Sequence, residues 1–135
     1  MRSLTLVLKL VAPLFFIVGA LHLVLGLGAD ALLGATLPAE AMNDAALDSQ
    51  NRFYATAFTL YGVLLFVCST DIRKYATVLR CVLWVFFVAG LARFVSIARH
   101  GSPPPMIWLL LVSEVLPPPL LAWWLSRVSL ERRPR

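Results

Sequence analysis

The feature that most restricts the fold of this chain is a series of four long apolar stretches, at about residues 6–27, 53–69, 78–98 and 106–126. An α-helix needs about 20 residues to cross the hydrocarbon core of a bilayer. Each stretch is continuously apolar rather than alternating, which favours helices over the strands of a membrane barrel. The sequence therefore predicts an all-α fold, a transmembrane four-helix bundle, with residues 1–135 forming a single integral membrane domain.

Composition supports a membrane environment and excludes one class of partner. Hydrophobic residues make up 60% of the chain, against about 45–50% apolar residues in soluble domains. The formal charge is +5, but the basic residues flank the apolar stretches and form no stripe interleaved with aromatic residues. We therefore expect no nucleic-acid partner.

The distribution of Lys and Arg predicts the orientation, because cytoplasmic flanks are enriched in both. Four spans leave only Arg52, Arg93 and Arg99 on the outer side. The other nine fall on the opposite side, and they are Arg2, Lys9, Arg73, Lys74, Arg80, Arg127, Arg132, Arg133 and Arg135. We therefore expect both termini in the cytoplasm.

The first span and the connection that follows it call for separate predictions. An alternative interpretation of the first span is a cleaved signal peptide. The apolar run from Leu10 to Leu27 is, however, longer than the apolar core of a usual signal peptide. The outer connection between the first two spans is Ala-rich and polar, and we expect a short interfacial helix at about Pro38–Leu47.

No motif for a familiar chemistry occurs. The sequence lacks a Gly-rich phosphate loop, a nucleophile elbow and paired metal ligands, so it predicts no catalytic residue, no metal and no cofactor. Cys68 and Cys81 have neither metal-ligand spacing nor a disulfide framework, and we interpret them as small apolar fillers. A non-enzymatic role is favoured, although a dispersed membrane active site is left open.

Ionisable residues inside the spans are the first candidates for function, because charges in a bilayer are costly unless paired. At about 1.5 Å of rise per residue, His22, Arg52, Arg93 and Glu114 all fall in the outer half of the bundle. Helical spacing places Ser96 on the same face as Arg93. The candidate cluster, either a ligand site or structural, is His22, Asn51, Arg52, Arg93, Ser96 and Glu114.

Glu114 has no cation within reach on its own helix, so the sequence predicts that it pairs with Arg93. Arg52 and His22 are expected to complete this network at its outer rim. One interpretation is that these groups only join helices. The other is a water-accessible pocket in which Arg52 and Arg93 receive an anionic or polar head group.

A run of three prolines follows Glu114. Pro117–Pro119 have no amide hydrogens, so the carbonyls one turn earlier, at about residues 113–115, lose their helical donors and the helix should kink. Such carbonyls are tolerated in a membrane where they face protein or a cavity. The kink is either a packing feature or part of a small polar cavity with Glu114.

Three segments carry a resemblance to a known family. Asn51-Arg52-Phe53-Tyr54 opens the second span, Gly90-Leu91-Ala92-Arg93 continues to His100-Gly101-Ser102-Pro103, and Glu114 follows. This order resembles the small bacterial membrane family known as domain of unknown function 4345. The resemblance implies a multi-pass protein of the bacterial inner membrane and carries no catalytic residue over.

The hypotheses for function belong to three classes. The first is a non-enzymatic bundle that binds a membrane lipid or lipophilic small molecule, or accompanies a membrane-protein partner or a second copy of itself. The second is a membrane isomerase with Glu114 as acid or base, suggested by a distant similarity to four-helix sterol isomerases. Those enzymes use more than one buried carboxylate, whereas this chain has one. The third is a small oligomeric transporter.

Overall fold

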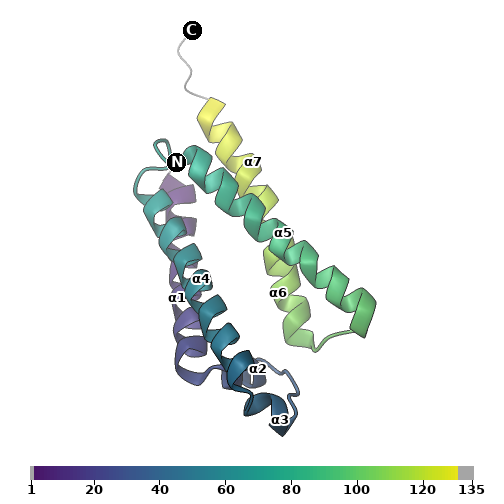
Figure 1. The fold of residues 1–135 in the computed structure, drawn as a ribbon. Helices are drawn as coiled ribbons and strands as arrows, with labels where there is room; N and C mark the ends of the chain where they lie inside the picture. Colours follow the sequence, from purple (N-terminus) through teal and green to yellow (C-terminus); the bar gives the residue numbers. More distant parts are fainter. Residues whose placement is uncertain (1, 131–135) are drawn as a thin grey trace.

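The structure is a computed structural model that describes residues 2–130, with side chains described as far as Arg127. Within this range the chain is helical and contains no strand. The helices are α1 (Arg2–Leu25), α2 (Leu27–Leu32), α3 (Ala39–Met42), α4 (Ala45–Thr70), α5 (Ala76–His100), α6 (Pro105–Val115) and α7 (Pro117–Leu130) (Figure 1).

Four helical segments are long and apolar enough to cross a membrane: α1, α4, α5 and the segment Pro105–Arg127, which comprises α6 and most of α7. This confirms the all-α transmembrane four-helix fold. Arg132, Arg133 and Arg135, which contribute to the predicted orientation, lie outside the described residues.

The helices are arranged as two hairpins. α1 packs along α4, and α5 packs against α6 and α7, whereas α4 and α5 touch far less extensively. Figure 1 shows the hairpins meeting near the connection between α4 and α5 and spreading apart toward α3 and α6. Leu8 of α1, Leu79 of α5 and Leu125 of α7 are all buried in the core that the hairpins share.

Two glycines bring α1 and α4 together. A Cβ atom on Gly19 would lie 1.9 Å from the Thr59 Oγ1 atom, and one on Gly62 would lie 2.8 Å from the Phe15 Cβ atom. Small residues at helix interfaces let backbones approach closely in lipid, where no hydrophobic force drives helices together. The first hairpin therefore depends on these two positions.

α4 begins eight residues before the expected span at about residue 53. The Asp44 side chain caps the helix by accepting hydrogen bonds from the amides of Ala46 (2.8 Å) and Leu47 (3.1 Å). The helix therefore extends beyond its apolar segment. This cap also divides the interfacial helix expected at about Pro38–Leu47, of which only α3 forms a separate helix.

The fourth span is interrupted where the sequence predicts a kink. α6 ends at Val115 and α7 begins at Pro117. The Leu116 amide still donates to the Val112 carbonyl at 3.0 Å, but the next three residues are prolines without an amide hydrogen. The carbonyls of Ser113, Glu114 and Val115 therefore have no amide donor one turn ahead.

Candidate functional site

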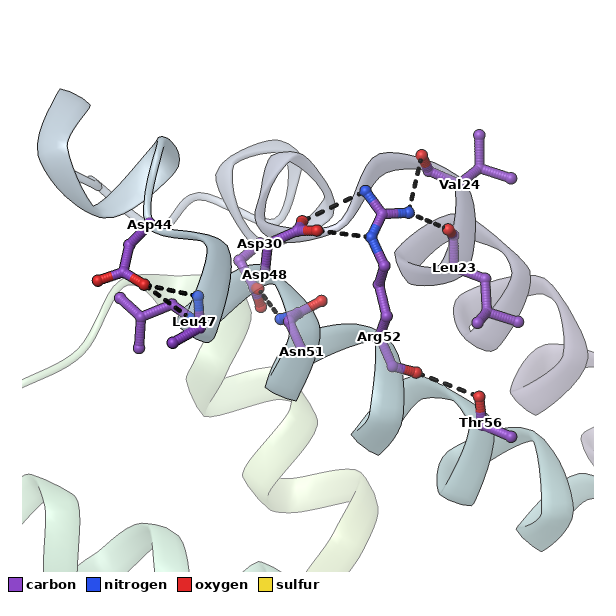
Figure 2. A network of polar contacts seen from close by, with 10 residues as sticks. Leu23, Val24, Asp30, Asp44, Leu47, Asp48, Asn51, Arg52 and Thr56 are labelled. Atoms are coloured by element: carbon purple, nitrogen blue, oxygen red, sulfur yellow. Dashed lines mark hydrogen bonds and ion pairs between the residues drawn. The ribbon is translucent and has the colours of Figure 1, made fainter.

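Arg52 organises one group of polar side chains at the end of the first hairpin. Its Nε atom donates to Asp48 Oδ2 at 2.7 Å and its Nη2 atom donates to Asp48 Oδ1 at 3.3 Å. Its Nη1 atom donates to the carbonyl of Leu23 and, at 3.4 Å, to that of Val24 (Figure 2). These carbonyls lie in the last turn of α1, where no helical amide can reach them. Arg52 therefore caps α1 from α4.

Asp30 of α2 binds both long helices of the same hairpin. Its Oδ2 atom accepts a hydrogen bond of 2.6 Å from Asn51 Nδ2, and its Oδ1 atom lies 3.5 Å from His22 Nε2. The other ring nitrogen of His22 lies 2.9 Å from the Val18 carbonyl oxygen. These contacts fasten α2 across the ends of α1 and α4. We call His22, Asp30, Asp48, Asn51 and Arg52 the outer network.

Gly26 allows the chain to turn over this network. Its φ is 54°, in the left-handed region that favours glycine. A Cβ atom there would lie 1.9 Å from Asp48 Oδ1 and 3.0 Å from Arg52 Nη2. Both the backbone conformation and the space therefore require glycine at this turn.

Arg93 and Glu114 form the second group, between α5 and α6. The Arg93 Nε atom donates to Glu114 Oε2, and its Nη2 atom donates to Glu114 Oε1 at 2.6 Å. This is a bidentate pair, and Glu114 is only 5% exposed. The structure confirms the pair that the sequence predicts.

Gly90 makes this pairing possible, because it lies about one turn before Arg93 on the face of α5 that meets α6. A Cβ atom on Gly90 would lie 2.8 Å from the Glu114 Cβ atom and 3.1 Å from Val115 Cγ2. The two helices therefore lie close together at the point where the Glu114 side chain leaves α6.

Two clefts lie between the hairpins. The smaller cleft, of about 550 Å³, is bordered by α4, α5 and α6. We call it the polar cleft because its lining, although largely apolar, includes Tyr54, Arg93, Ser96 and Glu114. The apolar cleft, of about 840 Å³, is bordered by both hairpins and the break between α6 and α7. The side chains that line both clefts are Phe58, Tyr61, Phe86 and Glu114.

Comparison with known proteins yields one match. The family model described as Domain of unknown function (DUF4345) matches residues 3–125. The chain belongs to this family. No curated protein and no solved structure matches it.

Membership confirms the resemblance carried by Asn51-Arg52-Phe53-Tyr54, the segment around Arg93, and Glu114. The description of the DUF4345 family assigns no activity. It therefore gives this DUF4345 protein no catalytic residue, and the function must be inferred from the geometry of the clefts.

The structure divides the six candidate residues of this DUF4345 protein into two groups. Arg93 and Glu114 are paired and line the polar cleft with Ser96. His22, Asn51 and Arg52 belong to the outer network, and among the described residues no hydrogen bond links that network to Arg93 or Glu114.

The expectation that Arg52 and His22 complete the Arg93–Glu114 network is thus corrected. Arg52 has a nearer partner in Asp48, one turn earlier on its own helix, and His22 faces Asp30. The sequence interpretation missed both acidic residues. The spacing of four between Asp48 and Arg52 was an available signal, because residues at this spacing face each other on a helix.

Proposed function

We propose that this protein binds a lipophilic molecule of the membrane in the apolar cleft and catalyses no reaction. The observation that carries the proposal is the cleft itself, whose volume of about 840 Å³ falls within the range of about 300–1,000 Å³ for ligand pockets. Its lining is almost wholly apolar, with the buried Glu114 beside it. This combination suits a molecule with a long apolar body.

Aromatic packing supports a persistent cleft. The ring centroids of Phe15 and Phe86 lie 5.3 Å apart, and those of Tyr61 and Phe86 lie 4.8 Å apart. The Tyr61 hydroxyl also donates a hydrogen bond to the Val82 carbonyl. These contacts join the first hairpin to α5 at mid-depth, so the hairpins have a fixed separation beside the cleft.

The pairing of both arginines changes the kind of ligand that fits. The sequence interpretation has Arg52 and Arg93 receiving an anionic head group. In the structure Arg52 is paired with Asp48 and Arg93 with Glu114. Each guanidinium charge is thus already balanced by a carboxylate, which favours an apolar occupant over an acidic lipid.

Retention of a lipophile during purification tests the proposal. Val11 lines the apolar cleft, whereas its neighbour Leu10 is 65% exposed on the outside of α1. We expect native mass spectrometry to detect a bound lipophile in the wild-type protein and in the Leu10→Trp control, and to find it lost from Val11→Trp. Absence of any bound molecule from the wild type, or equal retention in all three proteins, would refute the proposal.

The isomerase alternative is supported by one observation, which is that Glu114 lines both clefts. An acid or base role would require Glu114 to exchange a proton while it is held by Arg93. Turnover of an identified substrate that disappears in Glu114→Gln would establish this role. The transporter alternative requires an oligomer, and a strictly monomeric particle in detergent would exclude it.

We further propose that the protein resides in the bacterial inner membrane with both termini in the cytoplasm. The basic residues are concentrated at the chain ends and in the connection between α4 and α5, and Figure 1 shows the start of α1 beside that connection. We would replace Cys68 and Cys81 and then introduce one cysteine at a time, at Lys74 or at Glu40. An impermeant thiol reagent should label the cysteine at position 74 only from the cytoplasmic side and the cysteine at position 40 only from the outer side. The reverse labelling would contradict this orientation.

A further inference from the structure

Among the residues that line the apolar cleft, free hydrogen-bond acceptors exceed free hydrogen-bond donors. The Glu114 carboxylate has about four lone-pair positions, and the two hydrogen bonds from Arg93 use one position on each oxygen. Arg93 lines the polar cleft but not the apolar cleft. The carboxylate therefore retains acceptor capacity, and Glu114 also lines the apolar cleft.

The break between α6 and α7 supplies further acceptors. Ser113, Glu114, Leu116, Pro117 and Pro118 all line the apolar cleft, so the break lies at its wall. The prolines that follow cannot donate to the carbonyls of residues 113–115. An acceptor left without a donor in an apolar medium is costly, and a ligand that supplies the donor recovers that cost.

The side-chain hydroxyl groups near Glu114 in the cleft already donate hydrogen bonds within the protein. The Tyr61 hydroxyl donates to the Val82 carbonyl, and the Ser113 hydroxyl donates to the Leu110 carbonyl at 2.7 Å. The other side-chain donors of the lining are the indole N–H groups of Trp123 and Trp124, further along α7. The wall near Glu114 thus presents acceptors without a matching free side-chain donor.

We propose that the apolar cleft selects lipophilic molecules that carry a hydrogen-bond donor, such as a primary amine or an alcohol. The Glu114 carboxylate and the carbonyls of Ser113 and Glu114 accept that donor. The apolar body of the ligand lies along α1 and α7, where the lining is aliphatic and aromatic. A lipophile with a carboxylate in place of the donor would face acceptors only and bind more weakly. This inference rests on the proposed lipophile-binding function.

Matched amphiphiles test the inference. Trp123 and Trp124 line the cleft, so brominated ligands bound there should quench tryptophan fluorescence. We would titrate 12-bromododecylamine, 12-bromododecanol and 12-bromododecanoate into the protein in nanodiscs of zwitterionic lipid. We expect the amine and the alcohol to saturate at concentrations about tenfold lower than the carboxylate, because the carboxylate brings no donor to the buried acceptors. Tighter binding of the amine than of the alcohol would identify Glu114's charge as the stronger acceptor.

The titrations distinguish failure of donor selection from failure of lipophile binding. If the three amphiphiles bind equally, or the carboxylate binds best, donor selection is overturned while lipophile binding stands. If none of them quenches with saturation, the proposed function and this inference fall together.

A proline variant separates the freed carbonyls from the carboxylate. Replacing Pro117 and Pro118 with Leu returns amide donors to the carbonyls of Ser113 and Glu114 and leaves the Glu114 side chain intact. We expect the preference for the alcohol over the carboxylate to fall several-fold, while Pro13→Leu, on the exposed side of α1, preserves it. An unchanged preference in the double variant would exclude the carbonyls from recognition.

Discussion

Arg52 and Arg93 make similar ion pairs in different surroundings. Arg52 pairs with Asp48 one turn away on the same helix, and the two side chains are 40% and 36% exposed. Arg93 reaches from α5 to α6, where the Glu114 side chain is 7% exposed. The first pair closes the end of a hairpin, whereas the second joins two helices at the wall of a cleft. Equal geometry therefore does not mean equal energy, because the surroundings decide how much each pair contributes.

The largest effect should come from breaking the buried pair. Arg93→Leu leaves the Glu114 carboxylate buried without its partner, and we expect the free energy of unfolding to fall by about 3–5 kcal/mol. Reversible unfolding in mixed micelles would measure the loss. Arg99→Leu, at an exposed position of the same helix, is the control and should remain close to wild type. Wild-type stability in Arg93→Leu would mean that the pair contributes nothing to the bundle.

A smaller effect should follow from separating the two helices without removing either charge. Gly90→Ala places a methyl group 2.8 Å from the Glu114 Cβ atom, and overpacking of this kind costs about 1–3 kcal/mol. In the control, Gly28→Ala, the added methyl group meets only Leu25 Cβ at 3.7 Å, an ordinary contact. If both variants unfold alike, close packing at Gly90 is not what holds Arg93 against Glu114.

The smallest effect should come from the exposed pair. Asp48→Asn removes one charge of the outer network but keeps an oxygen that Arg52 can bind, and Arg52 still caps the carbonyls of Leu23 and Val24. We expect thermal unfolding to shift far less than in Arg93→Leu, and the shift to shrink further as salt is added, because exposed pairs are screened. A loss as large as that in Arg93→Leu would reverse the ranking of the two pairs.

The sequence predicted the spans because continuous apolar runs have few structural outcomes in lipid. It also predicted the Arg93–Glu114 pair, since a lone carboxylate at membrane depth needs a cation at the same depth. The start of α4 was missed because hydropathy does not detect a helix that continues into water. Asp44 and the polar turn after it maintain that helix beyond the apolar run.

The division of the polar residues into two groups was harder to predict. Depth alone placed His22 and Arg52 near Arg93, but in the structure they pair with Asp30 and Asp48, which belong to their own half of the bundle. The spread of the hairpins, which creates the clefts, depends on which helix faces pack together. Gly19 and Gly62 fix that choice for α1 and α4, and hydropathy does not report it.

The central claim is that Arg93 and Glu114 act as one buried unit, unlike Asp48 and Arg52. The most direct measurement is a pair of double-mutant cycles for unfolding, one with Arg93→Met and Glu114→Gln and one with Asp48→Asn and Arg52→Met. The account predicts a coupling energy of about 1.5–3 kcal/mol between Arg93 and Glu114, several times that between Asp48 and Arg52. Equal coupling in the two cycles, or none between Arg93 and Glu114, would contradict it.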